Sequence, residues 1–129
     1  MKKIVFVLLA SVSTCVNADD RVVAKGFDLV DGAIVCNSLD LADYISSRIN
    51  QARHARQSLS PELRRQATLI RGDNPGAEPR PSDYGCTFVP IGTLMTAQNG
   101  NYVPVVSGVL ADGRRFSGVT LPAMVGHQP

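Results

Sequence analysis

Residues 86–125, CTFVPIGTLMTAQNGNYVPVVSGVLADGRRFSGVTLPAMV, decide the fold that this sequence predicts. The stretch alternates short runs rich in Val, Thr and other strand-favouring residues with pairs that favour tight turns. Asn99-Gly100 and Asp112-Gly113 are hairpin signals, because these residue types tolerate the positive φ that a two-residue turn needs. We therefore expect consecutive short β-strands joined by hairpins over residues 86–125.

The chain before this region combines an extended part, a helical insertion and a loop. Residues 21–36 are predicted to be extended, with a turn at Asp31-Gly32. Residues 38–70 carry apolar residues at helical spacing, which predicts two helices. The break falls where Ser60 precedes Pro61, a capping hydroxyl followed by a proline suited to the first helical position. Residues 71–85 are rich in glycine and proline and are predicted to form a loop.

The two predicted helices have recognisable ends and faces. Asn37 or Ser38 is expected to cap the first helix, because either side-chain oxygen can accept from a free amide of the first turn. In the second helix Leu63, Ala67 and Ile70 recur at helical spacing and predict one apolar face.

Part of the strand region resembles a known barrel. Residues 89–96, VPIGTLMT, resemble the segment of bacterial secreted Src-homology-3-like domains in which a Pro-x-Gly-Thr turn enters a strand. Residues 118–125, GVTLPAMV, resemble the closing segment of that family, with Val119 where the family has Trp. The resemblance covers about a third of the chain. It implies a binding or structural module rather than an enzyme.

The fold class predicted from these observations is mainly β with an α insertion, an α+β fold. Short strands and tight hairpins favour a closed or nearly closed barrel. We expect a small Src-homology-3-like β-barrel in which a helical hairpin lies between the first and second strands.

The N-terminus has the pattern of a signal peptide. Lys2 and Lys3 precede an apolar run over residues 4–10, and Val16-Asn17-Ala18 fits a cleavage site. Residues 1–18 are therefore predicted to be a signal peptide and residues 19–129 a single disulfide-linked domain, periplasmic or secreted.

A cleaved leader has two alternatives, a transmembrane anchor and a lipoprotein. A transmembrane anchor needs about 20 apolar residues, more than this run supplies, so the mature protein is expected to have no transmembrane span. A lipoprotein would keep Cys15 in acylated form, but Thr14 is not the small residue that such a signal has before its cysteine.

Cleavage leaves two cysteines, Cys36 and Cys86, in the mature chain. An even pair in an exported chain predicts a disulfide. It would close a loop of 51 residues, counting both cysteines. On the chain-entropy model that closure is worth about 4 kcal/mol. Two unrelated thiols and a redox-active pair are the alternatives, and the absence of a Cys-x-x-Cys motif argues against the second.

Charge is the one patterned surface feature of the sequence. Of the 13 basic residues, Lys2 and Lys3 lie in the leader, which leaves 11 basic against 11 acidic residues in the mature chain. A run of arginines falls in the predicted helices, and its members are the candidate partner-binding residues: Arg48, Arg53, Arg56, Arg64, Arg65 and Arg71. They would bind a protein or an anionic envelope component. The alternative is internal pairing with the aspartate-rich segment 19–45.

The sequence offers little for chemistry. The mature chain has two histidines, His54 and His127, and neither lies in the context of a catalytic triad. We expect no metal and no cofactor, and a neutral chain without interleaved aromatic residues does not predict nucleic-acid binding. The predicted function is a noncatalytic exported interaction or structural module. The alternatives are a secreted inhibitor or immunity-type protein that blocks an enzyme and, less favoured, a cell-wall hydrolase.

Overall fold

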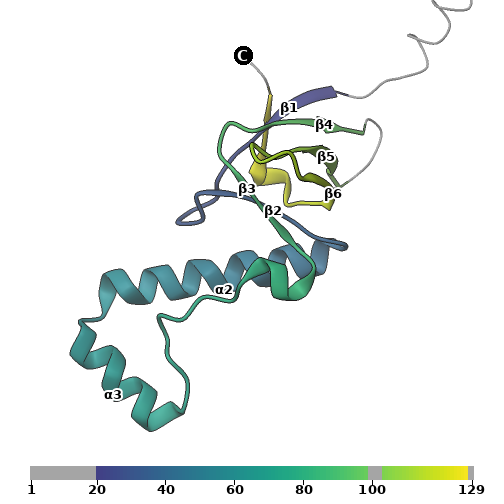
Figure 1. Ribbon diagram of the computed structural model, residues 1–129. Helices are drawn as coiled ribbons and strands as arrows, with labels where there is room; N and C mark the ends of the chain where they lie inside the picture. Colours follow the sequence, from purple (N-terminus) through teal and green to yellow (C-terminus); the bar gives the residue numbers. More distant parts are fainter. Residues whose placement is uncertain (1–19, 99–102, 128–129) are drawn as a thin grey trace, which may run out of the picture.

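The computed structural model describes residues 20–98 and 103–127 of the 129-residue chain (Figure 1). Its elements follow in this order: β1 Asp20–Ala24, β2 Gly32–Val35, α2 Leu39–Ser58, α3 Pro61–Arg71, the 3-10 turn η1 Pro81–Tyr84, β3 Thr87–Pro90, β4 Leu94–Ala97, β5 Val105–Val109, β6 Arg115–Val119, the 3-10 turn η2 Pro122–Met124 and β7 Val125–His127. The predicted signal peptide, Cys15 and the predicted Asn99-Gly100 turn lie outside the described residues. Within the described part of the chain, no helix is both long and apolar enough to cross a bilayer.

The strands form two antiparallel sheets. Five strands pair in the order β6-β5-β4-β1-β7, and β2 pairs with β3 in a separate two-stranded ribbon. The α+β class is therefore confirmed. The predicted closed barrel is not what these residues form, because the ribbon meets the larger sheet through one bridge. There the Cys36 N–H donates to the Val119 carbonyl at 2.9 Å, and the Val119 N–H donates back to the Cys36 carbonyl at 2.7 Å.

The helical insertion follows two strands rather than one. The chain turns tightly between Phe27 and Val30, whose backbones bond to each other, and Asp28 adopts a φ of 56°. This turn comes before the predicted Asp31-Gly32 turn, and Gly32 already belongs to β2. The turn sends β2 away from β1, so the two strands enter different sheets and the insertion leaves from β2.

The helix ends follow the predicted caps. Ser38 caps α2, with its hydroxyl accepting from the Leu41 N–H at 3.2 Å. Ser60 caps α3 in the same way, accepting from the Leu63 N–H at 3.2 Å, and Pro61 opens the helix. Both caps supply an acceptor to an amide that has no partner within the helix.

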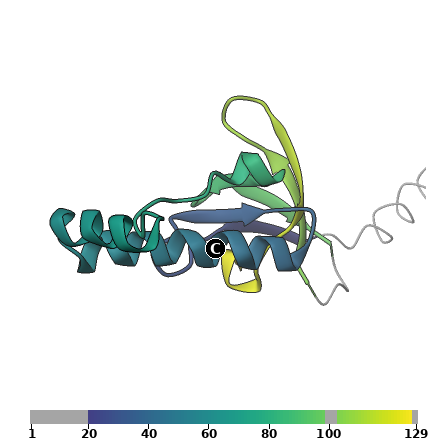
Figure 2. The same cartoon turned by 90° about the horizontal axis from the view of Figure 1, so that it is seen from below.

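The apolar residues of α3 do not pack as a buried face. Leu63 is 50% exposed and Ile70 is 83% exposed, and no residue of α3 is buried. Figure 1 and Figure 2 show the cause: α3 lies beyond the sheets, at the far end of α2, so the core cannot cover it. The apolar residues of α3 recur at helical spacing, as predicted, but they do not pack into the core.

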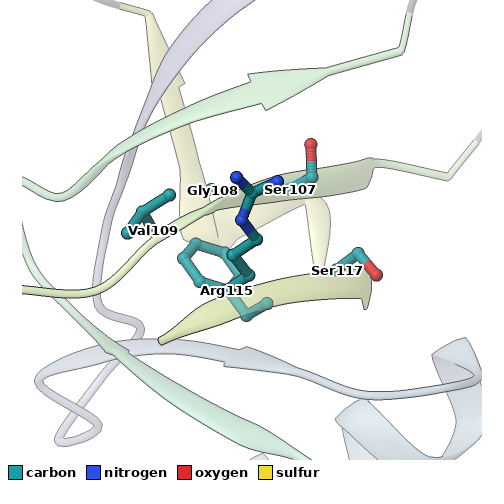
Figure 3. A pocket seen from close by; sticks show the side chains of 6 residues that line it. Ser107, Gly108, Val109, Arg115 and Ser117 are labelled. Atoms are coloured by element: carbon teal, nitrogen blue, oxygen red, sulfur yellow. The ribbon is translucent and has the colours of Figure 1, made fainter. Parts of the chain in front are cut away.

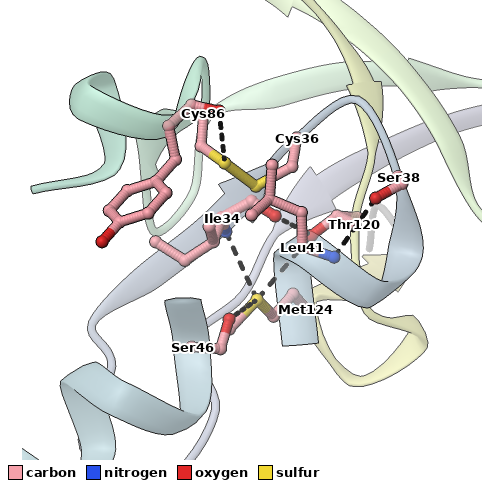
Figure 4. The surroundings of a disulfide bond; sticks show 9 residues. Ile34, Cys36, Ser38, Leu41, Ser46, Cys86, Thr120 and Met124 are labelled. Atoms are coloured by element: carbon pink, nitrogen blue, oxygen red, sulfur yellow. Dashed lines mark hydrogen bonds between the residues drawn. A yellow bond between two sulfur atoms is a disulfide. The ribbon is translucent and has the colours of Figure 1, made fainter. Parts of the chain in front are cut away.

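The core lies where the ribbon, the first half of α2 and the larger sheet meet. Ile34, Ile45, Val89 and Met124 are fully buried there. The Met124 sulfur is central to this region (Figure 4): it accepts from the Ile34 N–H at 3.3 Å, and the Ser46 hydroxyl lies 3.9 Å away. Burying these side chains stabilises the fold by about 1.5–3 kcal/mol for each large aliphatic residue.

The predicted disulfide is present. Cys36 and Cys86 are bonded across the ribbon, at the end of β2 and just before β3 (Figure 4). The bond therefore joins the two ends of the segment that contains both helices and the loop. It fixes the base of the insertion to the core.

Candidate interaction surface

Two of the predicted partner-binding arginines fasten the insertion together. Arg53 donates to Asp31 at 2.7 Å, to Glu78 at 2.9 Å and to the Leu29 carbonyl at 2.9 Å. Arg56 also donates to Glu78. These bonds hold both the N-terminal turn and the loop after α3 to α2, because the Arg53 side chain contacts the two segments at once. The alternative of pairing with segment 19–45 therefore holds for Arg53, through Asp31, but not for Arg56, whose carboxylate partner Glu78 lies outside that segment.

Two further arginines of the set form hydrogen bonds with groups that lie near them in the sequence. Arg64 donates to the carbonyls of Arg56 at 3.1 Å and of Leu59 at 3.0 Å, which caps the end of α2. Arg65 pairs with Glu62, one turn earlier in α3. Four of the six candidate arginines therefore make side-chain bonds within the chain.

Glu78 is the carboxylate that accepts from both Arg53 and Arg56. Its side chain is 24% exposed. The hydrogen bond from Arg53 holds the pKa of the Glu78 carboxyl below its ordinary value of 4.5, and Arg56 lowers it further. A lowered carboxyl pKa means that the charged form is the one the fold stabilises.

Replacing Glu78 with Gln is expected to lower the free energy of unfolding by about 1–2 kcal/mol at pH 7, because charged hydrogen bonds to two arginines are lost. Since the folded pKa is depressed, this stabilisation is complete above the unfolded pKa and disappears as pH falls through the folded pKa. Urea unfolding at pH 7 and at pH 3 should therefore show a difference between variant and wild type that shrinks in acid.

The matched control is Glu62→Gln, which removes an exposed partner of a single arginine, Arg65. Exposed pairs contribute about 0–1 kcal/mol. An equal loss of stability in the Glu62→Gln and Glu78→Gln proteins would contradict the role assigned to Glu78.

The remaining two arginines of the set border a cleft. A cavity of about 500 Å³ is lined by residues of α2, of the end of α3 and of the loop that follows α3. Its lining consists of Arg48, Gln51, Ala52, Ala55, Leu59, Arg71, Asp73, Asn74, Pro75 and Ala77. Arg71 pairs with Asp73 at 3.6 Å, whereas Arg48 has no carboxylate partner among the described residues. The cleft therefore has a positively charged side at Arg48.

A pair of tyrosines lies next to this cleft, in contact with its Arg48. The rings of Tyr44 and Tyr84 meet edge to face with centroids 6.3 Å apart. The Arg48 Nη1 donates to the Tyr44 hydroxyl at 3.0 Å, and its guanidinium lies 5.8 Å from the centre of that ring. Both rings are partly exposed. We call the cleft together with Tyr44 and Tyr84 the α2 groove.

The groove has a simple origin in the helix. Tyr44, Arg48, Gln51 and Ala55 are three or four residues apart, so they share one face of α2. Sequence reasoning identified Arg48 and Arg71 but not the tyrosines. The i, i+4 spacing of Tyr44 and Arg48 was a usable signal, but nothing in the sequence places Tyr84 beside them.

The groove carries basic, phenolic and apolar side chains. Asp73 is its only carboxylate among the described residues, and these place no histidine or cysteine in it. The described residues also contain no group of three or more side chains placed to hold a metal ion.

Comparison of the chain with protein-family models, with curated proteins and with solved structures found no match.

Proposed function

We propose that this protein is a noncatalytic module that binds a protein partner, or an anionic envelope component, through the α2 groove. The observation that carries the proposal is a cleft lined by Arg48 and Arg71, next to which the exposed Tyr44 bonds to Arg48 and packs against the exposed Tyr84. Tyrosine and arginine are the residue types most enriched among the energetically dominant residues of protein interfaces.

Export to the periplasm or secretion is part of the proposal. It is supported by the leader-like residues 1–18 and by the disulfide between Cys36 and Cys86, a bond that persists in oxidising compartments. A module of this kind would meet its partner outside the cytoplasm.

We also propose kinship with secreted Src-homology-3-like domains. Two local features support it: the turn at Ile91 and Gly92 leads into β4, and the η2 turn leads directly into β7. Both are the features for which residues 89–96 and 118–125 resemble that family. In this proposal the barrel of the family is opened into two sheets.

The groove can be tested by charge reversal combined with cross-linking. A photo-cross-linking residue at Gln51 is expected to capture one partner from the compartment where the protein resides. With that partner purified, the double variant Arg48→Glu, Arg71→Glu is expected to bind on the order of 100-fold more weakly, since two interface arginines are inverted. Calorimetric titration measures the change.

The control is Arg114→Glu, on the turn between β5 and β6, whose partner is Asp112. Unchanged affinity in the double variant, or an equal loss in the control, would overturn the groove assignment. If the captured partner is an enzyme whose activity stops in the complex, the inhibitor alternative is the correct form of this function. The loop that lines the groove would favour it, because the bond from Arg56 to the Gly76 carbonyl at 2.7 Å preorganises it.

A further inference from the structure

Arg21 and Arg115 differ from the other arginines of the described residues. Each of the others makes a hydrogen bond or an ion pair within the chain. The side chains of Arg21 and Arg115 make neither among the described residues, and both residues are exposed. An arginine that the fold leaves unpaired at neutral pH keeps its full capacity to bind an anionic group.

Both arginines lie on the outer face of the five-stranded sheet. Side chains alternate between faces along a strand, and Val22, Met95, Val106 and Phe116 are buried. Their neighbours along the strands therefore point outward.

The outward residues form two rows across the strands. Register places Arg21 opposite Thr96, Thr96 opposite Ser107, and Ser107 opposite Ser117. This is a row of three hydroxyls that begins with a guanidinium. In the adjacent row Leu94 lies opposite Val23, and Arg115 lies opposite Val109.

The face is hollowed on both sides of β5. A depression of about 410 Å³ on the β6 side is lined by Arg115, Ser117 and Phe116, and one of about 380 Å³ on the β4 side is lined by Arg21, Thr96 and Leu94. The two share Ser107, Gly108 and Val109. Figure 3 shows the Arg115 side chain reaching from β6 toward β5, beside Ser107. The arginines thus stand at opposite ends of one shallow surface.

We propose that this face is a second docking surface, separate from the α2 groove, that takes an acidic segment of a protein partner. Carboxylates of the segment pair with Arg115 and Arg21, and the hydroxyls of Thr96, Ser107 and Ser117 bond to its polar groups. Leu94 and Val109, each about half exposed, supply apolar contact between the two charges.

The composition of the face favours a protein over other anionic partners. Nucleic acids and anionic membranes are bound by many closely spaced basic residues, because each phosphate contact adds a similar small increment. Here two arginines are separated by three strand spacings, roughly 14 Å, with hydroxyl and apolar groups between them. That alternation of charged, polar and apolar groups is the pattern of a protein interface.

The test is a titration of the isotopically labelled protein with an octaglutamate peptide at low ionic strength, followed by nuclear magnetic resonance. The peptide, at about 3.3 Å per extended residue, is long enough to reach both arginines. The amide signals of Ser107, Gly108 and Ser117 are expected to shift. The Arg21→Gln, Arg115→Gln protein is expected to bind at least tenfold more weakly.

The control is the Arg80→Gln, Arg114→Gln protein, which loses the same charge from arginines already paired with Asp83 and Asp112. Its affinity should equal that of the wild type, and both variants should keep the wild-type unfolding midpoint. Equal weakening in both variants would show a response to net charge alone and overturn the proposal, as would shifts confined to the α2 groove. Binding to phosphatidylglycerol vesicles that depends on Arg21 and Arg115, without binding of octaglutamate, would assign the face to a lipid surface instead.

Discussion

Replacing Cys36 and Cys86 with alanine is expected to lower the free energy of unfolding by about 4 kcal/mol. The two residues are 50 positions apart, so the bond removes a large loop entropy from the unfolded chain. Domains of this size have roughly 5–15 kcal/mol in total. Alanine is used because both positions are buried and a serine hydroxyl would add a second cost. Urea unfolding measures the change from free energies extrapolated to zero urea, with the slope fitted separately for each protein, because the unfolded chain exposes more surface without the cross-link.

Reduction provides the control for this substitution. Wild-type protein treated with a thiol reductant should unfold near the midpoint of the alanine variant, because both lack the cross-link and keep the same packing elsewhere. If the alanine variant and the oxidised wild type had the same urea midpoint, the disulfide would not stabilise the fold by restricting the unfolded chain.

Replacing Gly118 with alanine is expected to cost about 3 kcal/mol or more, because the new methyl group has no space. An added Cβ would lie 2.3 Å from the Cys36 carbonyl oxygen and 3.1 Å from Cγ1 of Val35. The carbonyl cannot move freely, since it accepts from the Val119 N–H in the bridge that links the two sheets. Overpacking costs of 1–3 kcal/mol assume side chains that can adjust, and a fixed carbonyl adjusts less. Thermal unfolding and urea unfolding both report the loss.

Gly113→Ala separates this steric effect from backbone strain. Gly113 has a φ of 90°, in the region that disfavours side chains, but an added Cβ meets no atom within 4 Å. It should cost only about 1 kcal/mol. Equal costs at Gly113 and Gly118 would mean that close approach of the two sheets is not what requires glycine at position 118.

Local sequence signals predicted helix ends and turns. They could not predict which strands pair across long distances in the sequence. Ser38, Ser60 and Pro61 fixed the helix ends because caps act within one turn. The Asp112-Gly113 turn was found for the same reason, and β5 and β6 pair around it. The separation of β1 from β2 depends on the turn near Asp28 and on partners far along the chain. Alternation of apolar residues does not specify those partners, so a closed barrel was the simpler prediction.

In the candidate site, too, local features could be predicted from the sequence and long-range contacts could not. The charge of Arg53 and Arg56 is visible in the sequence, but their partner Glu78 is more than 20 positions away and is brought close only by the returning loop. Sequence alone therefore could not separate arginines that hold the insertion together from those that face a cleft. Tyr84 joins Tyr44 for a comparable reason, since the disulfide and the loop place it beside α2.

The shape of α2 has a mechanical consequence. Its 20 residues form a rod about 30 Å long, clamped in the core over its first half and carrying α3 at its free end. A partner that pulls on α3 would transmit the force to the core through α2. The force would act on the part of α2 that is anchored in the core, where Ile45 and Ile49 are buried. The ion pairs of Glu78 with Arg53 and Arg56 tie the returning loop to α2 along the helix. The helix should therefore bend less under such a force while these pairs are intact.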